Sequence, residues 1–441
     1  MNLNAAGIDV GADRHLVAVP PGRDAGNQDV RQFGTFTADL QALADWLMVC
    51  GIETVAIEST GVYWIPLFDL LSERGFDVKL VNPRQLKHAP GRKTDVLDCQ
   101  WLQQLHTFGL LTGAFRPDDA GCVLRAYLRQ RAMLVSCASE HIQHMQKALE
   151  QMNVKLPEVV SDITGVTGMA IIRAMLAGER NPQTLATLRD RRCKQDEATI
   201  ARALEGSWRE EHLFSLRQAV ELFEVYQTKI GDCDRAIETC LQGFDDKSDG
   251  QPLAPERRSS KPHRNEPRFD ARSYLHRLTG VDLTRIDGLN AHSALKIIGE
   301  IGTDISPWRT EKQFARWTML APNSNITGGK AHRSRTKIAA SRVAAILRMA
   351  AESLHHSQSA LGAYFRRLKN RIGAAKAITA TAHKLACLIY KMLKFGTEYV
   401  DQGQDYYERR YQQRVVANLA RRAQQLGYQL VKNEGPSPAA A

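Results

Sequence analysis

Four acidic residues of this 441-residue chain lie where carboxylates can bind a metal ion. Asp9 lies at the end of the apolar run Ala6-Gly7-Ile8-Asp9-Val10, and Glu58 ends the run Thr54-Val55-Ala56-Ile57-Glu58. Both runs have the composition of short buried strands. Asp95 and Asp98 lie where we expect a helix to begin, and their i, i+3 spacing puts both carboxylates on one helix face.

Carboxylate oxygens are the ligands that Mg²⁺ prefers, with Mn²⁺ as the alternative ion. Two such ions can clamp the attacking and leaving oxygens of a phosphodiester. Each acid also has a structural alternative, since Asp9 can form a turn with the following glycine and Asp95 can cap a helix. Glu58 precedes Ser59-Thr60-Gly61 at a predicted sheet edge. The four acids together favour a metal site.

The elements that must position these acids alternate between strand and helix patterns over residues 1–115, which predicts an α/β domain with a mixed sheet. Predicted strands cover residues 6–10, 15–19, 54–58 and 78–81, and predicted helices lie near residues 40–47 and 65–74. Beyond this domain the strand signals fade and helical periodicity dominates.

We divide the remainder into four segments by composition. Residues 116–243 predict antiparallel helices or a coiled-coil arm, and residues 244–270 have the Pro-, Ser- and Asp-rich composition of a linker. Residues 271–398 predict a second helical domain, and residues 399–441 a charged helix followed by a disordered tail. In the helical domain, Ile286–Gly302 has the pattern of a helical hairpin that offers backbone N–H groups to phosphate, although a plain helical hairpin also fits.

These motifs resemble those of insertion-sequence transposases with a RuvC-like Asp-Glu-Asp-Asp domain, relatives of the pilin-gene invertases that include the bridge-RNA-guided recombinases. The matching segments are Gly7–Val10, Ile57–Tyr63, Val81–Pro83, Lys93–Asp98 and residues 281–395. The resemblance implies a ribonuclease-H-like α/β domain, a helical or coiled-coil middle and a mainly α-helical, basic carboxy-terminal transposase domain. It also implies that the four acids are catalytic metal ligands.

The loop Leu320–Lys330 contains the second candidate catalytic group. In the resembled family a serine of a Ser-Gly pair at this position attacks DNA and forms a covalent phosphoserine link. Thr327 stands there in this chain, and its methyl group restricts its approach and rotamers. Ser324 is a fallback, and a simple phosphate-binding turn over residues 327–330 is the structural alternative.

Positive charge is concentrated around this loop. Residues 312–396 contain sixteen Lys and Arg and one acid, a net +15, so the rest of the +11 chain sums to −4. A solvated helical face usually has interspersed acids, so this imbalance favours a polyanionic partner. The residues expected to contact nucleic acid are Lys330, Arg333, Arg335, Lys337 and Arg342.

The remaining composition limits the class of protein. None of the eight cysteines form a Cys-x-x-Cys pair, which excludes a zinc ribbon or redox motif of that type. The chain shows neither a signal-peptide pattern nor an apolar run near the ~18 residues that span a bilayer. We therefore expect the protein in the cytoplasm, and the resemblance implies a prokaryotic cell.

The sequence favours a Mg²⁺-dependent transposase or site-specific DNA recombinase that acts through a covalent hydroxyl-linked intermediate. The resemblance implies element ends and target DNA as substrates, a guide RNA, a homo-dimer or tetramer, and an active site composed of both domains. Two alternatives stay open. One is a hydrolytic nuclease such as a junction resolvase, in which Thr327 is dispensable. The other is a non-catalytic nucleic-acid-binding remnant.

Overall fold

The computed structural model describes residues 1–59, 61–83, 95–256, 264–322 and 341–431, and the backbone strands 326–327 and 330–331. The chain divides into two compact units, Met1–Arg116 and Pro117–Ala441. Within the described ranges, no helix combines the length and apolar character needed to cross a membrane.

The first unit is built on a five-stranded sheet with the order β3-β2-β1-β4-β5. Its strands are β1 (Ala5–Val10), β2 (His15–Ala18), β3 (Val30–Phe33), β4 (Thr54–Glu58) and β5 (Asp77–Val81). The strands β1, β2 and β3 are antiparallel neighbours, whereas β1, β4 and β5 run parallel. The sheet is therefore mixed, as predicted, and it includes one edge strand, β3, that the sequence did not indicate.

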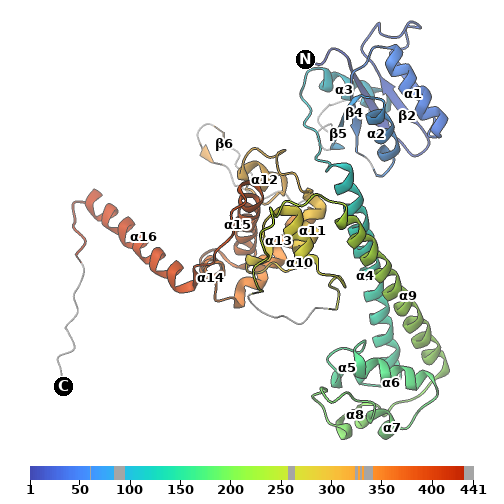
Figure 1. Cartoon of the computed structure of the whole chain (residues 1–441), viewed down its shortest axis with the longest axis vertical. Helices are drawn as coiled ribbons and strands as arrows, with labels where there is room; N and C mark the ends of the chain where they lie inside the picture. Colours follow the sequence, from blue (N-terminus) through green and yellow to red (C-terminus); the bar gives the residue numbers. More distant parts are fainter. Residues whose placement is uncertain are drawn as a thin grey trace. The chain divides into compact units, whose positions relative to one another are not determined.

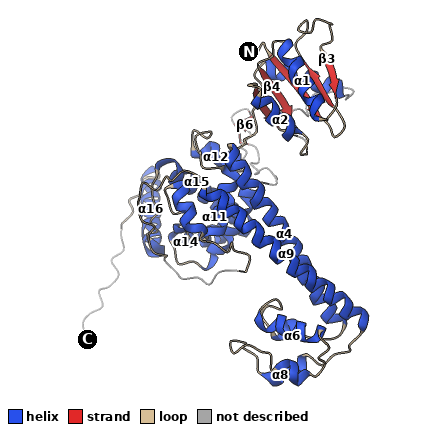
Figure 2. Ribbon diagram, turned by 45° about the vertical axis from the view of Figure 1, so that its right-hand side comes forward, coloured by secondary structure: helices blue, strands red, loops and turns tan. Residues whose placement is uncertain are grey.

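Helices cover both faces of this sheet (Figure 2). They are α1 (Thr37–Val49), α2 (Trp64–Glu73) and α3 (Asp95–Thr107). Alternate strand residues such as Ile8 and Ile57 join α1 and α2 in the larger core, and Ala56 packs with Leu102 of α3 on the opposite side. The approach of α3 to β1 is so close that a Cβ at Gly7 would lie 2.7 Å from the Cys99 carbonyl oxygen. Only glycine fits there.

The second unit begins with two long helices that pack along one another, α4 (Asp119–Gln151) and α9 (Glu210–Gln242) (Figure 1). At about 1.5 Å per residue, each 33-residue helix is roughly 50 Å long. Four short helices gather at one end of the pair: α5 (Leu156–Val159), α6 (Val166–Leu176), α7 (Pro182–Ala186) and α8 (Glu197–Ala203).

A buried ion pair joins the two long helices. Arg131 Nε of α4 lies 2.6 Å from Asp234 Oδ1 of α9, and the side chains are only 3% and 5% exposed. Arg131 also donates to the carbonyl oxygen of Asn265, and the Arg268 N–H donates to Asp234. The segment before the next helix is therefore held against the pair by charged hydrogen bonds.

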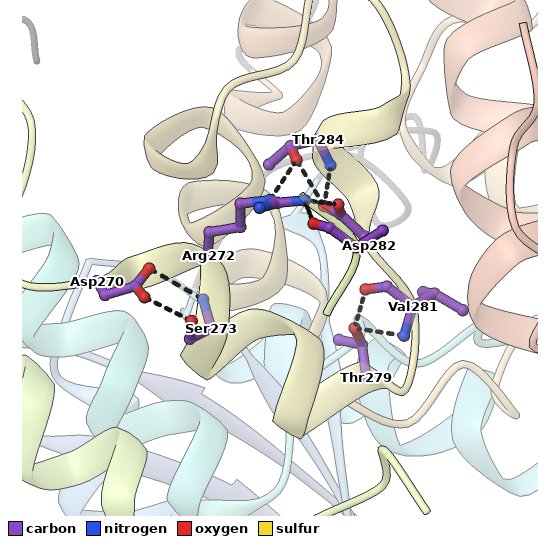
Figure 3. A network of polar contacts seen from close by, with 8 residues as sticks. Asp270, Arg272, Ser273, Thr279, Val281, Asp282 and Thr284 are labelled. Carbon is purple, nitrogen blue, oxygen red and sulfur yellow. Dashed lines mark hydrogen bonds and ion pairs between the residues drawn. The ribbon is translucent and has the colours of Figure 1, made fainter. Parts of the chain in front are cut away.

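Among the described residues, the regular structure in the rest of the unit consists of helices and one small hairpin. The helices are α10 (Ala271–Thr279), η2 (Leu283–Arg285), α11 (Ala291–Ile301), α12 (Glu311–Trp317), α13 (Arg342–Ser353), η3 (Leu354–His356), α14 (Ala360–Ile372), α15 (Ala374–Phe395) and α16 (Gly403–Gln425). Figure 3 shows how the first of them are tied together: Asp270 caps α10, and Arg272 binds the carboxylate of Asp282, which in turn caps η2.

The expected helical hairpin takes the form α10, η2, a glycine turn and α11. Gly288 in the turn has φ +89°, and a Cβ there would lie 2.6 Å from the Ala350 carbonyl oxygen of α13. Asn290 accepts a hydrogen bond from the Ser293 N–H and so caps α11. The turn thus packs against α13 at Gly288, and phosphate binding by this hairpin stays a prediction.

The structure confirms the predicted fold class, a mixed α/β domain followed by a largely helical remainder. Parts of the sequence interpretation fall outside the described residues: positions 257–263 of the proposed linker, residues 332–340 of the basic loop and residues 432–441 of the tail.

Candidate active site

Asp9 and Glu58 lie side by side at the carboxyl ends of two parallel strands. The register of β1 and β4 pairs Ile8 with Ile57, and one further step places Asp9 next to Glu58. Neighbouring strands are about 4.8 Å apart, and side chains alternate between faces. Because Ile8 and Ile57 face the core under α1 and α2, Asp9 and Glu58 belong to the face that α3 covers. Both acids are partly buried.

Backbone hydrogen bonds hold these two strand ends. The Gly11 N–H donates to the Arg14 carbonyl oxygen at 3.0 Å, which closes the turn after β1. Ser59 donates its N–H (2.9 Å) and its hydroxyl (3.1 Å) to the Val81 carbonyl oxygen, which ties the end of β4 to β5. The backbones that carry Asp9 and Glu58 are therefore fixed relative to each other.

The other two acids occupy the first turn of α3. The partial positive charge at a helix amino terminus stabilises carboxylates there. Asp95 accepts a 3.4 Å hydrogen bond from Arg14, which follows β1, so the start of α3 lies at the same end of the sheet as Asp9. Both side chains of this pair are more than half exposed (55% and 61%), so the pair contributes little to stability.

The buried thiol of Cys99 lies close enough to two of the acids to sense their charges. Burial, with a further contribution from the negative charges of Asp9 and Asp98, raises the pKa of Cys99 to about 12. The thiol therefore stays protonated at neutral pH and is not a thiolate nucleophile. Sequence reasoning missed the roles of Cys99 and Arg14. Because Cys99 directly follows Asp98, the sequence offered a weak signal that this thiol lies near the acids. The contact between Arg14 and Asp95 is long-range, so the sequence offered no local signal for it.

The four carboxylates fit a hard divalent cation by their chemistry. Among the described residues, however, no group of three or more His, Cys, Asp or Glu side chains is arranged to hold a metal ion. The structure brings the acids to one edge of the sheet from β1, β4 and α3, with the Arg14 guanidinium beside Asp95. A bound metal would have to draw them closer.

The candidate nucleophile lies in the small hairpin. Strands β6 (Ile326–Thr327) and β7 (Lys330–Ala331) pair antiparallel, with Thr327 opposite Lys330. The side chains of these strands lie outside the described residues, as do Ser324, Arg333, Arg335 and Lys337.

Arg342, at the start of α13, is the one residue expected to contact nucleic acid whose side chain the structure describes. It is 58% exposed, and its Nε lies 3.9 Å from Glu300. Glu300 also binds Arg129 at 2.7 Å and lies 3.7 Å from Arg125. Three guanidinium groups thus surround one carboxylate, so this surface of the second unit keeps excess positive charge.

Comparisons with known families agree with this geometry. Residues 6–154 match the profile of the DEDD transposase domain, described as "Transposase". Residues 282–366 match a second profile, described as "Transposase IS116/IS110/IS902 family". Together the matches cover just over half of the chain. No curated protein matches the chain.

The fold and these matches define an enzyme, a transposase whose amino-terminal DEDD domain is its catalytic domain. The chain belongs to the IS110 family of transposases. A DEDD nuclease domain implies a divalent metal ion, and a transposase implies DNA as a partner.

Proposed function

We propose that this transposase is a site-specific recombinase that cuts and joins DNA through a covalent link to Thr327. The observation that carries the proposal is the alignment of Asp9 with Glu58 at the ends of β1 and β4, on the face where α3 begins with Asp95 and Asp98. The localised +15 charge of residues 312–396 supports DNA binding by the second unit.

The proposed metal ligands are Asp9, Glu58, Asp95 and Asp98. When bound, Mg²⁺ or Mn²⁺ supplies electrostatic stabilisation of the negative charge that develops on the scissile phosphate. The partly buried positions of Asp9 and Glu58 limit the water around their carboxylates, which strengthens their interaction with any cation. Arg14 is already a cationic partner of Asp95, at 3.4 Å.

In the proposed reaction the Thr327 hydroxyl oxygen attacks phosphorus and displaces one deoxyribose oxygen. A Thr–O–P bond forms while a sugar O–P bond breaks; the hydroxyl proton is released and the departing sugar oxygen takes up a proton. Attack by a sugar hydroxyl of the partner strand reverses these steps and restores the threonine. The phosphodiester energy is kept in the covalent link, so joining needs no added energy source.

We further propose that Lys330, Arg333, Arg335, Lys337 and Arg342 hold phosphates near this loop, that a guide RNA selects the DNA sites, and that subunits of a dimer or tetramer share the active site. The guide RNA has a direct test: sequencing of the RNA that co-purifies with the protein from its host. A discrete RNA from the flank of the element is the expected result. Recovery of bulk cellular RNA without a discrete species would contradict RNA guidance.

The acidic site is tested by metal-dependent cleavage of a DNA substrate containing the element ends. We expect Asp9→Asn and Glu58→Gln each to lower cleavage at least 100-fold, because one carboxylate ligand is lost. The matched control is Asp45→Asn on α1, which covers the opposite sheet face and whose side chain is 62% exposed. Unchanged cleavage by Asp9→Asn and Glu58→Gln would refute the metal site.

A further inference from the structure

The helices α14, α15 and α16 surround a cavity of about 430 Å³. Its size is in the range of small-molecule sites, about 300–1,000 Å³. It lies largely beyond the second family match, which ends at residue 366. Four of its lining residues are tyrosines, and we call it the tyrosine cavity; they are Tyr399, Tyr406, Tyr407 and Tyr411.

The tyrosine cavity is positively charged. Lys384, Arg410 and Arg414 line it, and none of the described residues that line it is acidic. Burial, and secondly the charge of Arg414, lowers the pKa of Lys384, as expected for cations that lack a carboxylate between them. An anion entering the cavity would gain from all three.

Cation–π contacts hold two of the four tyrosine rings, those of Tyr407 and Tyr411. The guanidinium carbon of Arg367 lies 3.3 Å from the Tyr411 ring centre and 5.8 Å from that of Tyr407. Arg414 lies 5.3 Å from Tyr411 on the same helix. These rings are therefore oriented before any ligand arrives, which lowers the entropy cost of stacking a planar group on them.

The chain around the tyrosine cavity is also positively charged. Residues 360–425 contain thirteen Lys and Arg and four Asp and Glu, a net +9. One of the four acids, Asp401, is engaged structurally, since it accepts hydrogen bonds from the Ala360 N–H and the Tyr399 hydroxyl. A polyanion following this face would pass the cavity mouth.

We propose that the tyrosine cavity binds unpaired nucleotides of a single-stranded nucleic acid, with a base stacked on tyrosine and its phosphates on Arg410, Arg414 and Lys384. Oriented aromatic rings among cations are how proteins bind single strands with little sequence preference. A base within a duplex is already stacked and cannot enter. The inference builds on the proposed nucleic-acid function but does not need its metal or covalent chemistry.

The test measures fluorescence anisotropy of labelled 12-nucleotide oligothymidylate and oligouridylate, and of a 12-base-pair duplex, with the full chain in EDTA. Tyr406 is 39% exposed, so Tyr406→Ala removes a stacking surface without removing core. We expect it to weaken single-strand binding about tenfold, and Tyr406→Phe to retain binding. Arg410→Gln should weaken binding and reduce the salt slope by about 0.7.

Matched controls exist on the same part of the chain. Tyr428→Ala removes a 73% exposed tyrosine, and Arg421→Gln removes one charge from α16; neither residue lines the cavity. Both variants should bind single strands like the wild type, and duplex affinity should not change with Tyr406→Ala. The strand type that loses more affinity identifies the source as DNA or RNA.

Equal weakening of duplex and single strands by Tyr406→Ala, or no weakening by either cavity variant, would overturn the proposal. Competition by polyglutamate as effective as that by oligothymidylate would also overturn it and favour an acidic protein partner. The same measurement on Asp9→Asn separates the two proposals: single-strand binding should persist although cleavage is lost.

Discussion

Gly7→Ala is the substitution that most directly links the fold of the first unit to its acidic site. A Cβ at position 7 would lie 2.7 Å from the Cys99 carbonyl oxygen and 2.8 Å from Gln103 Cα. Ordinary contact begins at 3.4 Å, and the Gln103 backbone nitrogen would lie even closer to the added Cβ than the Cys99 oxygen does. The helix α3 must therefore retreat by more than about 0.7 Å, the difference between 3.4 and 2.7 Å. The atoms in the way are backbone, so no side-chain rotation relieves the clash.

Overpacking of this kind costs about 1–3 kcal/mol. Because Asp95 and Asp98 move with α3, we expect DNA cleavage to fall further than stability does, by about 100-fold, the usual effect of displacing catalytic groups by ~1 Å. Urea unfolding of the full chain measures the first quantity, and metal-dependent cleavage at a temperature where the variant is folded measures the second.

The matched control is Gly113→Ala in the same unit. An added Cβ there meets only the Leu80 carbonyl oxygen at 4.0 Å, an ordinary contact. This variant should match the wild type in stability and cleavage. If Gly7→Ala were as stable and as active as Gly113→Ala, our view that α3 packs closely on β1 because position 7 has no side chain would be refuted.

Three further predictions concern buried groups. Arg131→Met removes the partner of the buried Asp234 carboxylate, so the free energy of unfolding in urea should fall by about 3–5 kcal/mol. Loss of the exposed Arg173–Glu224 pair should change that free energy by less than about 1 kcal/mol. Similar losses in the two variants would contradict a large contribution from the buried pair. Burial lowers the pKa of His106 to about 4. Since its unfolded pKa is near 6.5, the unfolded state binds the extra proton, and stability is lost as pH falls from 6.5 to 4; His106→Gln should flatten that slope in urea titrations, and an unchanged slope would speak against it. Cys99, buried and with a pKa of about 12, should resist iodoacetamide at pH 8 until urea unfolds the chain, as read by peptide mass spectrometry; rapid labelling in the native protein would show the opposite.

The sequence predicted the strands that carry Asp9 and Glu58 because both are short apolar runs buried on a sheet. Strand β3 was missed because Arg31 and Gln32 interrupt its apolar pattern, and it lies at the sheet edge, where it pairs with β2. Helical periodicity predicted a helical arm, but it could not pair Arg131 with Asp234, which are 103 residues apart.

In the candidate site, too, local features could be predicted from the sequence and long-range contacts could not. Strand ends and helix starts can be inferred locally, so the sequence predicts all four acids as a set, and their role as metal ligands stays a prediction. The proximity of Asp9 and Asp98 to Cys99, and the position of Arg14 beside Asp95, depend on how closely α3 meets β1, and the lack of a side chain at Gly7 permits that close approach. The segment boundaries drawn from composition and the role of Thr327 stay predictions.

The proposed recombination depends on a covalent bond between DNA and Thr327. The most direct measurement is mass spectrometry of protein trapped with element-end DNA and Mg²⁺, digested with nuclease and protease. We expect a nucleotide-bearing peptide modified at Thr327, retained in Thr327→Ser and absent in Thr327→Ala and Asp9→Asn. Cleavage by Thr327→Ala at the wild-type rate with no protein-linked DNA would contradict it and identify a hydrolytic nuclease.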